Sequence, residues 1–314
     1  MDYLEQLADI KEIIFLKKND MKLSESPFDL RNVEFYQHWR QTKLENYPEN
    51  TNALRVKIND PENLSVETIN KIIALCRKTN MAIYKTRDDL DTAGVKNLAA
   101  FVGLENFDQP LYTGTVGVTS ISVASRGRQG DYIPYSNKPL SWHTDGYYNT
   151  PDRQIRGMVL HCRRPATNGG ISRFLDPEIA YIRLRDANPD WIRALMETDA
   201  LIIPENRENG KLIRNDSHGP VFSVIQNKLH MRYSARKKYV MWKDNEDLTA
   251  ARNFLTELLA GDEKYLFQHR LSAGEGMITN NVLHNRTAFT DFDDNAGRLF
   301  YRARFYDAVR KHPN

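Results

Sequence analysis

Residues 141–148 read Ser-Trp-His-Thr-Asp-Gly-Tyr-Tyr and contain the only His-x-Asp triplet of this 314-residue chain. Residues two apart on an extended strand point to the same face, so His143 and Asp145 can bind one ion. A second histidine from elsewhere would complete a set of two histidines and one carboxylate. That set leaves metal positions open and suits non-haem Fe(II) oxygen chemistry. A triplet this short also arises by chance, so the rest of the chain must supply its context.

Part of that context is a run of arginines near the carboxyl end. Arg298, Arg302 and Arg304 are evenly spaced, so on a strand they would share one face. On an exposed edge they would be solvated charges, but inside a barrel they would need anions as partners. Guanidinium groups bind carboxylates in a bidentate manner. The spacing therefore indicates a dicarboxylate or another anion bound near the metal.

Composition excludes several other classes of protein. The chain has 44 basic and 41 acidic side chains, a net charge of +3, and no basic stripe, so we expect no nucleic-acid partner. It has no apolar run long enough to span a membrane, and its start lacks an apolar signal core. Two cysteines make no disulfide framework. A cytoplasmic enzyme without a membrane partner is the expectation.

Hydrophobic periodicity predicts a mainly β fold with flanking helices (α+β). We expect a helical leader over residues 1–50, which is a candidate homo-oligomer contact, and a single domain over residues 51–314. Helices are predicted at residues 2–17, 33–46, 65–78, 88–101, 176–186, 189–198 and 247–260. Strands are predicted at residues 53–58, 81–86, 113–125, 155–163, 171–175, 199–203, 220–226, 228–234, 276–282 and 298–307. A tight turn is predicted at Asn227-Lys228, and two polar loops, 126–139 and 205–219, are predicted lids over the site.

The motifs together resemble those of the taurine dioxygenase (TauD/TfdA) family of Fe(II)- and 2-oxoglutarate-dependent oxygenases. The matching segments are Trp-His-Thr-Asp-Gly at 142–146, Gly-Gly-Ile-Ser at 169–172, Val-Leu-His-Asn-Arg at 282–286, and the stretch from Arg298 to Arg302. The carboxyl-terminal part is also similar to γ-butyrobetaine hydroxylase. Asn285 stands where the family usually has glycine, and Gly297 stands where an additional arginine often precedes Arg298.

The resemblance implies a double-stranded β-helix, or jelly roll, of the clavaminate synthase-like kind. It implies that His143, Asp145 and His284 bind iron, with His284 preferred over His161, His218, His230 and His269. It further implies that Arg298 and Ser172 bind the distal carboxylate of 2-oxoglutarate and that Arg302 lies near both cosubstrate and substrate. The expected reaction uses Fe(II), 2-oxoglutarate and O2, oxidises a small molecule, and releases succinate and CO2.

The substrate and the outcome remain open at this stage. Hydroxylation of a small polar or charged molecule is expected, but the same iron centre also supports desaturation, cyclisation or C–N and C–S cleavage. A non-catalytic jelly roll that binds a metal or ligand is the alternative of another class. Arg302 and Arg304 would suit an anionic substrate, whereas Trp142, Tyr147, Tyr148 and Tyr301 could cage a cationic amine. Asn281 is a candidate partner for the His284 ring.

Overall fold

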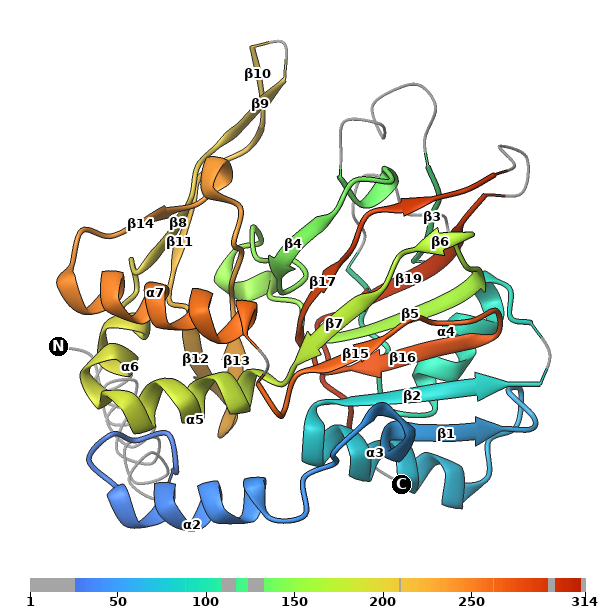
Figure 1. Cartoon of the computed structure of the whole chain (residues 1–314), viewed down its shortest axis with the longest axis horizontal. Helices are drawn as coiled ribbons and strands as arrows, with labels where there is room; N and C mark the ends of the chain where they lie inside the picture. The colour runs from blue at the N-terminus through green and yellow to red at the C-terminus, as the bar shows by residue number, and fades with distance from the viewer. Residues whose placement is uncertain are drawn as a thin grey trace, which may run out of the picture.

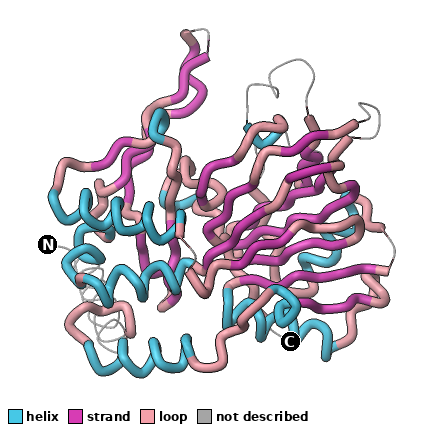
Figure 2. Tube along the Cα trace, viewed as in Figure 1, coloured by secondary structure: helices cyan, strands magenta, loops and turns pink. Residues whose placement is uncertain are grey.

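The computed structural model describes residues 26–311 except 88, 109–116, 124–132, 209, 262 and 293–296. Two β-sheets lie face to face, and helices cover one sheet and one end of the molecule (Figure 1; Figure 2). The helix predicted at 2–17 and the first half of the loop predicted at 126–139, residues 126–132, lie outside the described residues. Within the described part, no helix is both long and apolar enough to cross a membrane.

The larger sheet has six strands in the order β1-β2-β16-β5-β19-β3. Their bounds are Arg55–Ile58, Met81–Thr86, Glu275–Thr279, Gly157–Arg164, Leu299–Phe305 and Val118–Ile121, in sheet order. β1 and β2 are parallel, and the other neighbours are antiparallel. The crossover between β1 and β2 is helix α3 (Val66–Thr79), whose predicted cap, the Ser65 side chain, accepts from the Thr68 amide.

Alternate side chains of this sheet enter two different cores. On one face, Val159 and Ala303 pack with apolar residues of α3 and of helix α4 (Thr92–Ala100). On the other face, Cys162 and Phe300 pack against the smaller sheet. A strand buried on both faces needs apolar residues at successive positions, which explains the apolar run at 157–162.

The smaller sheet has four antiparallel strands in the order β15-β7-β17-β4. Their bounds are Phe267–His269, Ser172–Leu175, Leu283–Arg286 and Leu140–His143. Two short strands, β6 (Asn168–Gly169) and β18 (Phe289–Thr290), pair beside it. This sheet faces the larger one, as expected of a jelly roll, and both histidines of the predicted metal site lie on it.

Four helices lie at one end of the molecule (Figure 1). They are α2 (Val33–Leu44), α5 (Pro177–Ala187), α6 (Pro189–Leu195) and α7 (Glu246–Ala260). The buried Lys43 of α2 forms ion pairs with Asp176, at 2.7 Å, and with Glu178 at the start of α5. A buried ammonium group requires such partners, and the two carboxylates attach α2 to the core.

The region between α6 and α7 contains the largest departure from the predicted elements. Residues 201–219 form β8 (Leu201–Ile203), β9 (Asn206–Glu208), β10 (Lys211–Arg214) and β11 (Ser217–Gly219), so the predicted loop 205–219 is mostly strand. The β9–β10 hairpin projects away from the rest of the molecule (Figure 1). Its alternating pattern is weak because its side chains are largely exposed.

The hairpin of β12 (Phe222–Ile225) and β13 (Lys228–Met231) was predicted, but its turn is one residue earlier than expected. Gln226 and Asn227 both have positive φ, which is the pattern of a type I′ turn. The prediction of Asn227-Lys228 is wrong because Lys228 pairs with Ile225 and belongs to the strand. β14 (Met241–Trp242) pairs with β8, and short 3-10 helices occupy Thr51–Leu54, Ile133–Tyr135, Pro151–Arg153 and Lys237–Tyr239.

Candidate metal and cosubstrate site

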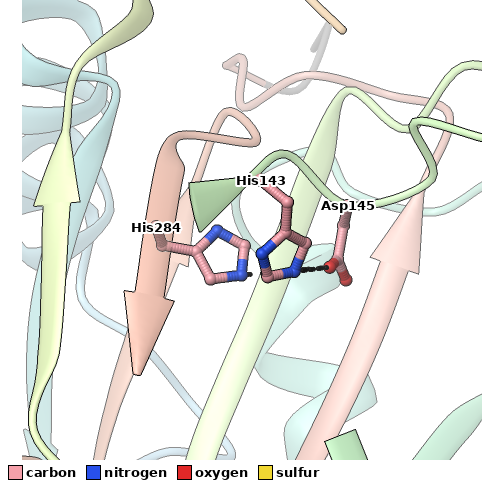
Figure 3. A group of neighbouring side chains, drawn as sticks. All are labelled: His143, Asp145 and His284. Atoms are coloured by element: carbon pink, nitrogen blue, oxygen red, sulfur yellow. Dashed lines mark ion pairs between the residues drawn. The ribbon is translucent and has the colours of Figure 1, made fainter. Parts of the chain in front are cut away.

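The structure brings His143, Asp145 and His284 together, although 139 residues separate the last two in sequence. β4 and β17 are neighbours, and His143 lies directly opposite His284 in their register. The two imidazole rings are 4.2 Å apart between centroids (Figure 3). Asp145 follows β4, and Gly146 then turns the chain at φ +67°, where a Cβ atom would lie 2.3 Å from Ile155. Glycine is needed at that turn for both reasons.

The three side chains direct ligand atoms toward one point. The Asp145 Oδ1 atom is 3.4 Å from His143 Nε2 and 3.9 Å from His284 Nε2. One ligand atom from each residue lies within 4.8 Å of the others. The Nδ1 atoms are hydrogen bonded at 2.9 Å to the carbonyls of Ser141 and Val282. A carbonyl accepts only from a donor, so each Nδ1 carries a proton, and Nε2 is the ring atom of each histidine that is left to face a metal.

The charge states of the ligands also suit a divalent cation. Burial opposes ionisation of Asp145, but Arg302 and the hydrogen bond from His143 outweigh burial and hold the pKa of this carboxyl well below its usual range. Burial and the neighbouring His143 lower the pKa of His284 to about 4, so this ring is neutral at pH 7. The Asp145 Oδ2 atom is buried and has no hydrogen-bond partner among the described residues. Two imidazoles and one carboxylate are the donor set that suits non-haem iron.

We expected Asn281 to orient the His284 ring, but its hydrogen bonds go to the backbone of Asp145 and Ile155. Its Oδ1 accepts from the Asp145 amide at 2.7 Å, and its Nδ2 donates to the carbonyls of Asp145, at 2.9 Å, and Ile155, at 2.7 Å. His284 is oriented by the carbonyl of Val282 instead. The expectation for Asn281 was therefore wrong, because a hydrogen bond to the second preceding carbonyl already satisfies the His284 ring.

Residues that follow β13 form hydrogen bonds along the segment that bears His143 and Asp145. Thr144 donates its amide to the Tyr233 carbonyl and accepts the Tyr233 amide on its hydroxyl, both at 3.0 Å. The buried Arg232 donates to the Tyr147 carbonyl at 2.7 Å, and also to carbonyls of β8 and β11. Nothing in the local sequence marked Arg232 or Tyr233, because their role depends on which segment lies opposite.

Arg298 lies one residue before β19 and is only 7% exposed. Its guanidinium packs over the rings of Phe289 and Phe300, at 5.1 and 3.8 Å from their centroids. Its side chain makes no hydrogen bond or ion pair with any residue that the structure describes. Burial, together with the neighbouring Arg286, lowers the pKa of Arg298 to about 9. An uncompensated buried cation of this kind calls for an anionic ligand.

Arg302 and Arg304 share a face of β19, as predicted, but their surroundings differ. Arg302 Nη1 is 3.2 Å from Asp145 Oδ2, at the metal site. Arg304 donates to Asp108 at 2.5 Å and to the Tyr148 hydroxyl at 2.8 Å. Because Asp108 already neutralises it, Arg304 is not the free anion-binding group that its spacing suggested.

Of the four aromatic residues considered as an amine cage, Tyr301 lies apart from Tyr147 and Tyr148. The Tyr147 ring lies 6.4 Å from His143, edge-on, and 5.3 Å from the Tyr148 ring. Tyr301 instead faces the opposite side of the larger sheet, where it stacks 6.4 Å from His161. Odd and even positions of a strand point to opposite faces, and Tyr301 is out of phase with the arginines.

The family model for the taurine catabolism dioxygenase TauD, TfdA family matches residues 42–304. Among curated proteins, a uridine-5′-phosphate dioxygenase of Amycolatopsis sp. is 30% identical over 176 residues, which are 54% of this chain and 62% of that protein. The chain therefore spans less than two thirds of that relative.

Solved structures confirm the predicted jelly-roll fold. A putative alpha-ketoglutarate-dependent taurine dioxygenase from Burkholderia xenovorans is similar with a TM-score of 0.55 at 16% identity, covering 81% of this chain and 89% of that one. The non-haem iron oxygenase OrfP, in complex with Fe and alpha-ketoglutaric acid, gives a TM-score of 0.56 at 16% identity, covering 79% and 80%. An asparagine oxygenase with Fe(II) and succinate gives 0.53 at 13%, covering 80% and 93%. The chain belongs to the TauD, TfdA family.

Proposed function

We propose that His143, Asp145 and His284 hold the iron and that Arg298 and Ser172 bind the distal carboxylate of 2-oxoglutarate. One observation carries the ligand assignment: one possible ligand atom from each of the three side chains lies within 4.8 Å of the other two. The carboxylate assignment is supported by the buried, uncompensated charge of Arg298. Ser172 supports it as well, because it lies on β7, adjacent to β17, which bears His284.

We propose that the chain is an Fe(II)- and 2-oxoglutarate-dependent dioxygenase: iron held by these residues would supply the oxidising power, with succinate and CO2 as co-products. The protein's own groups set the geometry. The carbonyls of Ser141 and Val282 fix the two imidazoles, and Asn281 fixes the backbone of Asp145. His143 and Asp145 are buried and His284 is half-buried, which limits water at the site and would strengthen the interaction of a cation with Asp145.

We also propose that the substrate is a small polar molecule with an anionic group. Arg302 pairs with Asp145 at 3.2 Å, and if Asp145 held iron its charge would be shared with the metal, which would leave the Arg302 guanidinium free to attract an anion. The Nε atom of Arg302 is already buried without a partner among the described residues. Tyr148 adds a hydroxyl whose oxygen accepts from Arg304, so its proton remains available to a substrate acceptor. Hydroxylation is the proposed outcome.

Anaerobic titration of the apoprotein with Fe(II) and then 2-oxoglutarate tests the site. We expect the visible charge-transfer band of the chelated cosubstrate to form in the wild type and to be absent in His143→Ala and His284→Ala. His38→Ala, which alters an exposed histidine of α2, is the matched control and should retain the band. A band that persists in His143→Ala would disprove the ligand assignment.

Substrate-dependent succinate release tests the substrate class. The first pair of probes is uridine-5′-phosphate, named for the curated relative, and uridine, which lacks the anionic group. Matched pairs of small amino acids, sulfonates and their neutral amides extend the panel. We expect turnover to favour the anionic member of a pair and Arg302→Met to reduce that preference. Equal turnover of both members by the wild type would contradict the proposal.

A further inference from the structure

Arg286, two residues after His284, is a second buried arginine that the proposed site does not yet explain. It is 5% exposed, and its Nε atom is buried with no hydrogen-bond partner among the described residues. Its Nη2 atom donates to the carbonyls of Ser136, at 2.9 Å, and Lys138. It forms no ion pair with any carboxylate in the described part of the chain.

The position of Arg286 in the sheet places it on the side of the cosubstrate. Arg286 and His284 are two apart on β17, so both side chains leave the strand on the same face. Across to β7, Arg286 lies directly opposite Ser172, and directly opposed residues of an antiparallel pair share a face. The face that carries the metal ligand therefore also carries Ser172 and Arg286.

Arg286 and Arg298 meet at one aromatic ring. Their guanidinium carbons are 4.7 and 5.1 Å from the centroid of Phe289. Asp291 is the nearby carboxylate: its Oδ2 accepts from the Arg298 amide at 3.0 Å, and its Oδ1 accepts from the Thr167 amide at 3.2 Å. Two positive charges beside one negative charge leave one charge unbalanced in a buried site, and one ligand carboxylate would balance it.

We propose that Arg286 is the second cation of the cosubstrate site and that its charge increases affinity for the distal carboxylate of 2-oxoglutarate. It does so beside Arg298, which makes the direct contact, while the Ser136 and Lys138 carbonyls hold Arg286 in place. This inference rests on the proposed function, and it assigns Arg286 to selection of a 2-oxo acid with a second carboxylate.

The test compares 2-oxoglutarate with 2-oxopentanoate, which has the same chain but ends in a methyl group. Each is titrated anaerobically into the Fe(II)-loaded full chain, and its Kd is read from the charge-transfer band. We expect Arg286→Gln to weaken 2-oxoglutarate about tenfold, as loss of one charged interaction would, and to leave 2-oxopentanoate within about twofold. Arg286→Lys, which keeps the charge, should restore most of the affinity for 2-oxoglutarate.

Arg185→Gln is the matched control. Like Arg286, Arg185 is a buried arginine (4% exposed) that donates to two backbone carbonyls, those of Pro27 and Asp29, and lies over an aromatic ring, that of Tyr36. Unlike Arg286, it lies on α5 and contacts no described residue of the proposed cosubstrate site. It should change neither Kd. An equal loss for both 2-oxo acids in Arg286→Gln, or no loss for either, would overturn the inference while the wild-type band stays intact. Absence of the band in the wild type would overturn the proposed site itself, and this inference with it.

Discussion

Strand β19 has a buried arginine near each end, and the two guanidinium charges have different surroundings. At one end, Arg304 is 4% exposed and is neutralised by Asp108, with Tyr148 as a further partner. At the other end, Arg298 is 7% exposed and its side chain has no counter-ion among the described residues. A buried guanidinium that the protein neutralises contributes to structure. One that it leaves unpaired prepares a site for an anion.

The largest expected effect is on the free energy of unfolding, when the ion pair between Asp108 and Arg304 is broken. Asp108→Asn should lower the free energy of unfolding by about 3 to 5 kcal/mol, because it leaves the Arg304 charge buried and uncompensated. Urea unfolding followed by circular dichroism measures this difference. Asp190→Asn is the control, since Asp190 and its partner Arg193 are 55% and 66% exposed, so that less than about 1 kcal/mol is expected. A wild-type stability for Asp108→Asn would remove the distinction between the two ends.

At the other end of β19, substitution of Arg298 should change the affinity for 2-oxoglutarate and leave the free energy of unfolding nearly unchanged. Arg298→Met should weaken 2-oxoglutarate about a hundredfold, because a bidentate contact between charged groups is lost. The free energy of unfolding of the apoprotein should fall by less than about 1 kcal/mol, because a buried uncompensated charge is removed and methionine still packs against Phe289 and Phe300. Anaerobic titration and urea unfolding of one preparation give both values. Strong destabilisation without a change in Kd would reverse the comparison.

Ligand-dependent stabilisation sharpens the contrast. With Fe(II) and 2-oxoglutarate at about ten times the wild-type Kd, mass action should add about 1.4 kcal/mol to the stability of the wild type. Asp108→Asn should gain a similar increment from a lower starting point, whereas Arg298→Met should gain almost none. Unfolding midpoints with and without the cosubstrate, measured without oxygen, give the increments. An increment in Arg298→Met equal to that of the wild type would show that the cosubstrate binds without Arg298.

The smallest expected effect concerns the Tyr148 hydroxyl, which accepts a hydrogen bond from Arg304. Tyr148→Phe should cost about 1 kcal/mol of stability, because Arg304 Nη1 loses its acceptor. The Kd for 2-oxoglutarate should stay within about twofold. Tyr306→Phe is the matched variant, since the Tyr306 hydroxyl donates to Asp108 at 2.8 Å on the other side of the same pair. A large change of Kd in Tyr148→Phe, with stability intact, would place Tyr148 in the cosubstrate site.

Much of the fold could be predicted because it depends on local physics. The apolar spacing and the Ser65 cap of α3, and the alternation along β19, are properties of neighbouring residues. The β9–β10 hairpin was missed because exposed side chains carry little hydrophobic pattern. The turn at Gln226-Asn227 was misplaced by one residue because strand pairing, and not turn composition alone, fixes the register.

In the candidate site too, some features follow from local sequence and others from tertiary packing. The sequence by itself determined the candidate ligands His143, Asp145 and His284 and the shared face of Arg302 and Arg304, because short motifs and strand parity are local. Arg286 could have been found in the same way, since it is two residues from His284. Only the tertiary structure decided that Asp108 neutralises Arg304 while Arg298 is left unpaired, and that Asn281 holds Asp145. Those roles depend on which distant group lies within 3 Å, and only the packing of the two sheets sets that distance.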